Sequence, residues 1–202
     1  MADEIPVVDI VMSLRYALGD MQGLNISDYE LIEPINQAAH KLYGYLSERH
    51  VREVVAEQEA TVASSGGKIT LDETFVRICQ VLGSDKENAT DNDYKVIIPT
   101  TSRTIVFGAY RLVGREIKTA KGKYIIEYYY IPSKVSTLND KLKVPESMRT
   151  WIEQLSLAFY KKDYVAADSI VRQCEAVLAG REVPNFENTN VAQTLGARAA
   201  QG

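Results

Sequence analysis

Apolar positions recur at helical spacing near the start of the chain. Val7, Ile10, Leu14 and Leu18 lie three or four residues apart, so their side chains fall on one face of a helix. Gly19 follows at the position where a left-handed residue commonly ends a helix. We therefore predict a short amphipathic helix here.

A second helix is predicted from Ser27 to about Glu48. Ser27 and Glu30 have the spacing of a capping box, in which the hydroxyl and the carboxylate accept hydrogen bonds from free amides at a helix start. Pro34 removes one backbone hydrogen bond, so we expect a kink or a delayed helix start there. The expected apolar face consists of Leu31, Ile35, Ala38, Leu42 and Leu46.

Between positions 51 and 144 the apolar residues fall in short, β-branched stretches that polar turns separate, which is typical of strands. The stretches that we expect to be extended are residues 54–62, 68–71, 75–82, 94–99 and 103–110. The clearest predicted hairpin joins residues 115–119 to residues 124–131 across a short loop that contains Gly122.

The second strand of this hairpin is rich in tyrosine. Its residues Tyr124, Ile126, Tyr128 and Tyr130 share one face, because side chains alternate along a strand. Tyrosine brings a large apolar ring and a polar tip to buried surfaces. The strand therefore belongs either to the core or to an interface, and its spacing fits both.

Helical spacing returns after Pro145. The third predicted helix carries Met148, Trp151, Ile152, Leu155 and Phe159 on one side. A fourth helix follows, with Asp163 as its N-cap and Gly180 just beyond its end. The apolar stripe of this helix consists of Ala167, Ile170, Val171, Cys174 and Val177.

This order of elements predicts an α+β fold in four parts. Residues 1–50 form two N-terminal helices, residues 51–144 an inserted, antiparallel β-rich domain, residues 145–180 two C-terminal helices, and residues 181–202 a flexible tail. In the simplest packing the four helices bury one another and the sheet projects from one end of the bundle.

The composition is that of an ordinary globular protein. The 202 residues are 46% hydrophobic, and 27 acidic against 23 basic residues give a net charge of -4. This charge argues against a protein whose main task is to neutralise nucleic-acid phosphates. Cys79 and Cys174 lie far apart in apolar stretches, so we expect two reduced, buried thiols.

The start of the chain carries no targeting signal that we recognise. Residues 1–4 lack the basic and apolar regions of a signal peptide. No run approaches the roughly 20 apolar residues that a membrane span needs. We therefore expect a chain that is made and folded in a cytoplasm and has no membrane partner.

The sequence offers no motif for catalysis, for a metal or for a cofactor, so we expect a protein that is not an enzyme. His40 lies on the second predicted helix and His50 at its exit, where surface or capping roles explain them. Residues 85–93 hold four acidic residues but lack the glycine and the terminal glutamate of a calcium loop. We expect a solvated acidic loop.

Charge is distributed unevenly along the chain. Residues 1–50 hold three basic and eight acidic residues, a net -5, whereas residues 95–123 hold seven basic residues and one acidic residue, a net +6. The two segments would attract each other in head-to-tail contacts between subunits, or the basic hairpin would line a channel for DNA. Separately solvated faces explain the pattern equally well. The basic residues concerned are Arg111, Arg115, Lys118, Lys121 and Lys123.

Two passages stand out by the order and spacing of their motifs. The first comprises residues 13–20 (SLRYALGD), 27–32 (SDYELI) and 35–38 (INQA). The second comprises residues 126–132 (IEYYYIP), Leu142, residues 144–146 (VPE) and the helix pair after them. Together they resemble the head-to-tail adaptor, or connector, proteins of tailed bacteriophages, with a helix ending in Leu-Gly-Asp, a capped helix carrying Asn-x-Ala, a closing strand and two terminal helices.

The resemblance implies a structural protein of the virion neck. Such a protein forms a dodecameric ring that docks under the portal protein, prolongs the DNA channel and gives a platform to a downstream neck or tail protein. Transient, non-specific contact with genomic DNA follows from that position. The resemblance also implies that residues 181–202 order against the portal, with Phe186, Val191 and Leu195 as candidate anchors. We expect the isolated chain to be a monomer.

Three alternatives remain open. Another neck component, such as a stopper or a tail-completion protein, is commonly smaller and dominated by strands, whereas the four helices here favour the adaptor. A DNA-binding module that uses the basic segment would bind DNA tightly as an isolated chain, with strong dependence on salt. An enzyme would require a pocket that unites His40 or His50 with the acidic loop.

Overall fold

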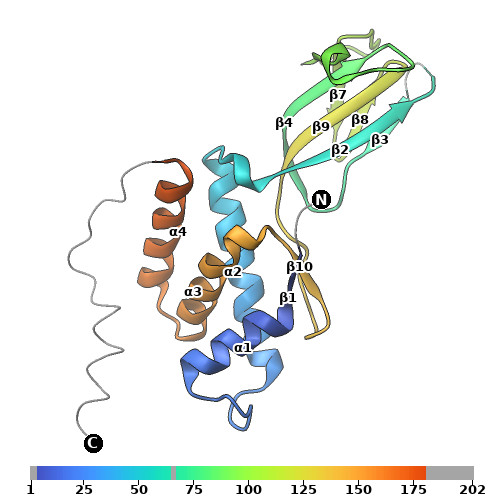
Figure 1. Ribbon diagram of the computed structural model, residues 1–202. Coiled ribbons are helices and arrows are strands. Elements are labelled where there is room, and N and C mark those ends of the chain that lie inside the picture. The colour runs from blue at the N-terminus through green and yellow to red at the C-terminus, as the bar shows by residue number, and fades with distance from the viewer. Residues whose placement is uncertain (1–3, 65–66, 181–202) are drawn as a thin grey trace, which may run out of the picture.

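The computed structural model describes residues 4–64 and 67–180, which form a helical bundle with a β domain projecting from one end (Figure 1). The predicted α+β class is confirmed, with four α-helices and sheets that are largely antiparallel. The predicted tail, residues 181–202, lies outside the described residues.

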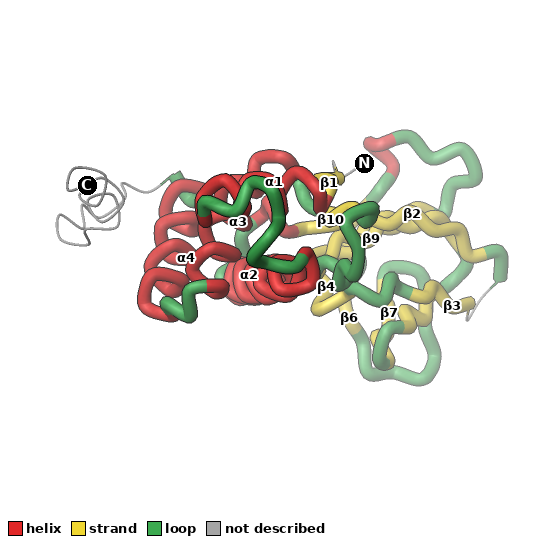
Figure 2. Tube along the Cα trace, turned by 90° about the horizontal axis from the view of Figure 1, so that it is seen from below, coloured by secondary structure: helices red, strands yellow, loops and turns green. Residues whose placement is uncertain are grey.

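The four helices lie where the apolar spacing predicts them. They are α1 (Val7–Leu18), α2 (Asp28–Glu48), α3 (Arg149–Tyr160) and α4 (Tyr164–Leu178). A 3-10 turn, Glu146–Met148, leads into α3, and two others are Arg52–Val54 and Asp91–Asp93. Helix α3 contacts the other three helices and lies between α1 and α4 (Figure 2).

The predicted helix ends are present. Gly19 has a φ of 72° and Gly180 a φ of 61°, so both take the left-handed conformation that closes α1 and α4. Ser27 and Glu30 form the capping box. Helix α2 begins at once after this box and continues through Pro34, so the delayed start is wrong: the box satisfies the free amides before Pro34 is reached.

The strands form three sheets. Beside the bundle, β1 (Glu4–Pro6) pairs with β10 (Lys141–Lys143), two strands that the sequence did not predict. The β domain contains two four-stranded sheets, in the orders β2-β9-β4-β5 and β3-β8-β7-β6. Their strands are β2 (Val55–Val62), β3 (Gly67–Thr70), β4 (Phe75–Ser84), β5 (Lys95–Val96), β6 (Ile98–Pro99), β7 (Ala109–Val113), β8 (Glu116–Thr119) and β9 (Gly122–Tyr130).

The hairpin predicted between residues 115–119 and residues 124–131 is wrong. Strands β8 and β9 belong to different sheets, and the chain crosses between the sheets at residues 120–121. The true hairpin joins β7 to β8 through Gly114, whose φ of 60° suits a two-residue turn. Gly122 has another role, because a Cβ atom there would lie 2.8 Å from the carbonyl oxygen of Ser84.

Residues 103–110 also differ from the prediction. Regular strand begins only at Ala109, and the residues before it form turns and irregular backbone. Strand β6 pairs with β7 in parallel, so the β domain is not wholly antiparallel. Both departures have one cause: β5 and β6 form a short crossing between the sheets, and the chain then needs a wide loop to return to β7.

The tyrosine-rich strand belongs to the core, and the interface interpretation of it is wrong. Tyr124, Tyr128, Tyr129 and Tyr130 are all buried within the chain. Tyr130 packs edge-on against Tyr43 of α2, with 5.2 Å between ring centroids, and thereby joins the β domain to the bundle. Burial raises the pKa of the Tyr43 hydroxyl.

A second contact at this junction involves Arg77 of β4. Its guanidinium donates to the carbonyl oxygen of Ser47 in the last turn of α2 and lies over the ring of Tyr129, 4.7 Å from the centroid. The ring of His50 packs edge-on against the same tyrosine. One arginine and one tyrosine therefore fix where the β domain leaves the helices.

The two cysteines differ. Cys174 is buried in the bundle, where burial raises the pKa of its thiol to about 12. Cys79 is exposed on β4, so the expectation that both thiols are buried is wrong for this residue. The reason is that Cys79 lies beside a register irregularity between Ile78 and Gln80, which turns it outward.

The corner between α1 and α2 is built on an ionic cluster in which Arg15 and Asp20 are buried and Asp28 is half exposed. Arg15 donates to Asp20 at 2.9 Å and to Asp28 at 2.6 Å. Asp20 also accepts hydrogen bonds from the backbone amides of residues 24, 25 and 26. Burial raises the pKa of the Asp20 carboxyl, but these amides and the Arg15 charge lower it more, so that the pKa lies below its ordinary value.

The returning chain is fixed to α2 by one side chain. The Asn36 amide donates to the Val135 carbonyl oxygen and accepts from the Val135 amide, both at 2.9 Å. Asn36 is only 5% exposed and Val135 only 6% exposed. The Asn36 side chain therefore pairs with the backbone of Val135 in the way that a neighbouring strand would.

Replacing Asn36 with alanine leaves a buried amide and a buried carbonyl of Val135 without partners. We expect Asn36→Ala to lower the free energy of unfolding by about 2–4 kcal/mol, measured by urea denaturation. Gln37→Ala, at the exposed neighbouring position, is the control and should change it by less than about 0.5 kcal/mol. Equal urea midpoints for Asn36→Ala and the unchanged chain would show that the hydrogen bonds between Asn36 and Val135 do not stabilise the fold.

The lowered pKa of Asp20 predicts how stability depends on pH. A carboxyl whose pKa is lower in the folded than in the unfolded chain stabilises the fold above its unfolded pKa of about 4, and this stabilisation is lost as the pH falls through the folded pKa. At neutral pH the unchanged chain should therefore unfold at a higher urea concentration than Asp20→Asn. This difference between the two urea midpoints should become smaller as the pH is lowered into the acid range. The exposed Asp91→Asn variant should show no such difference at either pH.

Candidate assembly surfaces

The outer face of α1 is apolar although its inner face already fills the core. Val8, Met12 and Tyr16 follow one another at intervals of four residues, so they form a stripe along the helix. Their exposed fractions are 40%, 45% and 77%. A helix at a protein surface normally has a polar outer face, so this stripe requires an explanation.

The corner between α1 and α2 carries three more exposed apolar side chains. Met21, Leu24 and Tyr29 are each more than half exposed. The contact of Arg15 with Asp28 holds the first turn of α2 beside the last turn of α1. We call the surface formed by these six residues the α1 flank: Val8, Met12, Tyr16, Met21, Leu24 and Tyr29.

A second apolar surface lies at the turn between α3 and α4. Tyr164 and Val165 are 63% and 78% exposed, and two exposed lysines, Lys161 and Lys162, precede them. Neither lysine has an ion-pair partner within the described part of the chain. We call the surface formed by these four residues the α4 corner: Lys161, Lys162, Tyr164 and Val165.

The third apolar surface is at the far end of the β domain and is called the β tip. Its exposed residues are Val96, Ile98, Val106, Phe107, Leu112 and Val113. A cavity of about 400 Å³ opens beside Phe107 and is also lined by Asp85, Lys86 and Asp93.

The basic residues of the β domain do not form one hairpin but follow the sheet register. Lys118 of β8 is the direct neighbour of Arg111 on β7 and of Lys68 on β3, so three cations lie side by side across three strands. Like charges directly opposite one another destabilise a sheet, and one ion pair, Lys68 with Glu116 at 2.8 Å, offsets part of this effect. Arg115 lies at the β7–β8 turn, and Lys121 and Lys123 lie at the crossing into β9.

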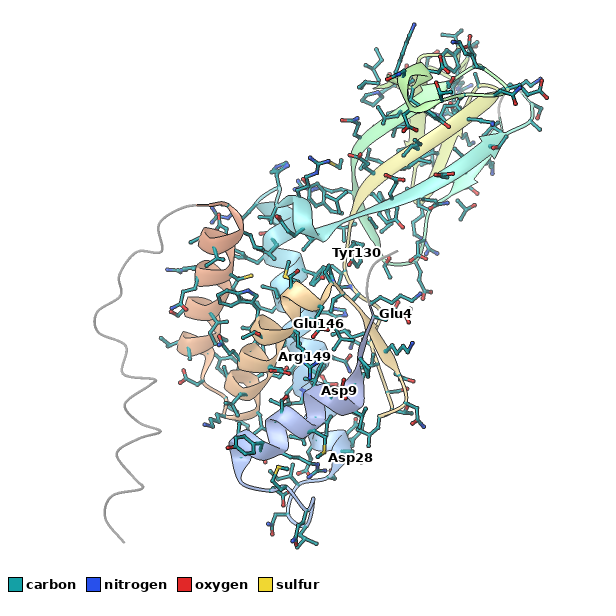
Figure 3. The ribbon with its side chains drawn as sticks, viewed as in Figure 1. Glu4, Asp9, Asp28, Tyr130, Glu146 and Arg149 are labelled. Atoms are coloured by element: carbon teal, nitrogen blue, oxygen red, sulfur yellow. The ribbon has the colours of Figure 1, made fainter. Side chains whose placement is uncertain are left out.

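Charged side chains also gather where α3 meets α1 (Figure 3). Arg149 binds Glu153 at 3.0 Å and Glu146 at 3.2 Å, and it reaches Asp9 of α1 at 3.9 Å. The hydrogen bond to Glu153 raises the pKa of Arg149. The arginine has three carboxylate partners within the chain, one of them on α1, so this cluster joins α1 to α3.

His40 and the acidic loop lie in different places. His40 lines a groove of about 390 Å³ between α2 and the start of β4, and its buried Nε2 has no hydrogen-bond partner among the described residues. The acidic loop lines the cavity at the β tip, and the two hollows share no lining residue. Lys86 and Thr90 hold the pKa of Asp93 far below its ordinary value. The pocket that an enzyme of this kind would need is not formed by these residues.

Within residues 4–64 and 67–180, no three His, Cys, Asp or Glu side chains come close enough to hold a metal ion. None of the described helices is both long enough and apolar enough to cross a membrane. The candidate portal anchors Phe186, Val191 and Leu195 lie outside the described residues.

Sequence reasoning found the basic residues but missed the exposed stripe of α1. The signal for this stripe was present, since Val8, Met12 and Tyr16 add a second apolar line to a helix that needs only one. No protein-family model matches the chain, and no curated protein matches it.

Proposed function

We propose that this chain is a head-to-tail adaptor of a tailed bacteriophage, a structural subunit of the virion neck. In this proposal twelve copies form a ring under the portal, extend the DNA channel and provide a platform for a downstream neck or tail protein. The bundle supplies the body of each subunit. The tail, with Phe186, Val191 and Leu195, binds the portal.

What supports the proposal is that the two passages that resemble this family meet in space. Asn36, from the first passage, binds Val135, which follows the closing strand of the second passage and lies 99 positions away. The Leu-Gly-Asp motif ends α1 and supplies Asp20 to the ionic corner. The residues that carry the resemblance are therefore those that determine how α1, α2 and the returning chain are arranged.

A second candidate function has one observation in its favour. Lys68, Lys118 and Arg111 form a row that a phosphate backbone would neutralise, so a DNA-binding module remains the rival from another class. In the adaptor the same row, with Arg115, Lys121 and Lys123, faces the channel or a neighbouring subunit. Tight DNA binding by the isolated chain, lost as salt rises, would favour the rival. A stopper or a tail-completion protein is the other alternative, and it would not bind the portal directly.

The first test is native mass spectrometry of the chain alone and with the portal ring encoded in the same genome. We expect a monomer alone and, with the portal, a complex containing one copy of the chain per portal subunit. A stable ring without the portal would contradict the expected monomer. An intact portal ring that binds no copies would overturn the adaptor proposal.

The second test concerns the tail. The triple variant Phe186→Ser, Val191→Ser, Leu195→Ser removes three apolar anchors and should weaken portal binding at least about tenfold. A matched control, Asn185→Ser, Asn188→Ser, Gln193→Ser, should bind as the unchanged chain does. Both variants should unfold at the same urea concentration as the unchanged chain. Undiminished portal binding by the first variant would refute a portal-binding tail.

A further inference from the structure

We infer that the α1 flank of one copy binds the α4 corner of a neighbouring copy, so that side-by-side contacts between bundles build the ring. The inference rests on the proposed function, since it names the surfaces through which that ring forms. Three features of the described residues carry it: the apolar character of both surfaces, their opposite charges and their positions about α3.

The α1 flank has the composition of a subunit interface. Tyrosine and methionine are enriched in the cores of interfaces, and the flank contains two of each. The stripe of Val8, Met12 and Tyr16 runs along a helix whose opposite side is already buried, and 40% or more of each of these side chains is left exposed. Six exposed apolar side chains on one helix and its following corner exceed what scattered surface residues explain.

The α4 corner is the apolar surface that lies at the same level of the bundle. Tyr164 and Val165 stand at the start of α4, and Phe159 of α3 supports the Tyr164 ring edge-on, with 6.3 Å between centroids. The supporting contact holds the tyrosine in place before any partner arrives, which lowers the entropic cost of binding.

The charges beside the two surfaces differ in sign, although Asp163, next to Lys162, offsets part of the positive charge at the α4 corner. Beside the α1 flank, Glu30 and Glu33 are exposed at the start of α2 and have no ion-pair partner among the residues that the structure describes. Lys161 and Lys162 at the α4 corner are exposed in the same way. An α1 flank approaching an α4 corner would therefore bring the carboxylates of Glu30 and Glu33, which form hydrogen bonds but no ion pair, near the ammonium groups of Lys161 and Lys162. This attraction favours flank against corner over flank against flank.

The arrangement of the helices suits a closed ring. A ring of identical subunits needs two different surfaces that meet at one height along its axis. Helix α3 lies between α1 and α4 (Figure 2), so the flank and the corner belong to helices on different sides of α3. The β tip is also apolar, but it lies at the opposite end of the molecule from α1 (Figure 1). A contact between α1 and a β tip would stagger successive copies along the axis and leave the assembly open.

The test uses cysteine pairs placed on separate chains. In a Cys79→Ser background, Tyr16→Cys marks the α1 flank, Val165→Cys marks the α4 corner, and Val106→Cys marks the β tip as a control of similar exposure. Pairs of these full-length variants are mixed at high concentration without the portal and treated with a short bis-maleimide. Mass spectrometry of the digested dimers then counts which positions are joined.

We expect the pair of positions 16 and 165 to be joined about tenfold more often than the pair 16 and 106, a ratio that corresponds to about 1.4 kcal/mol of contact free energy. Met12→Asp should reduce the joining of 16 to 165 to the level of the control pair, whereas Val106→Asp should leave it unchanged. Equal yields for both pairs, or joining mainly of 16 to 16, would overturn the inference. Because the portal is absent, this result is independent of whether the portal proposal holds.

Discussion

The arrangement of the chain depends on the two hydrogen bonds between the Asn36 amide and the backbone of Val135. The β domain is inserted between α2 and α3, so the chain must come back to the bundle, and closing so long a loop has an entropic cost. Asn36 offers a donor and an acceptor from the side of a helix, as the edge of a sheet would. The returning segment therefore docks at one position, and β10, the turn before α3 and α3 itself follow from it.

The ionic corner at Arg15 has a different effect, because it fixes an orientation. Removing both charges of a buried ion pair from water costs free energy that offsets much of their attraction, so the pair adds little net stability. Its main effect is to fix how the groups that carry the charges are oriented. Arg15, Asp20 and Asp28 set how α1 meets α2, and this decides which line of apolar residues faces inward. The outward position of Val8, Met12 and Tyr16 is thus a result of the same corner that ends the first helix.

The helices could be predicted because their signals are local: a capping box, a left-handed glycine and apolar residues at a spacing of three or four. Strand pairing could not, since the loop before Tyr124 looks like a hairpin turn in sequence but is a crossing between sheets. Gly122 is a glycine because Ser84 approaches it closely, which depends on a distant strand. The basic residues were found singly, but only the register shows that Lys68 joins Lys118 and Arg111. The α1 flank was not predicted because the apolar positions from Val7 to Leu18 already indicated a helix with one buried face. The second line of apolar residues, Val8, Met12 and Tyr16, was not needed for that prediction.

The two strands that connect the β domain to the bundle have a consequence for how such a chain changes over evolutionary time. Val55, which begins β2, and Tyr129, near the end of β9, are direct antiparallel partners, so the points where the β domain starts and finishes lie about 5 Å apart. A tight turn could bridge that distance. Lengthening, shortening or exchanging everything between these two residues would then leave the helices undisturbed, so a lineage can vary the β domain while it keeps the helical scaffold unchanged.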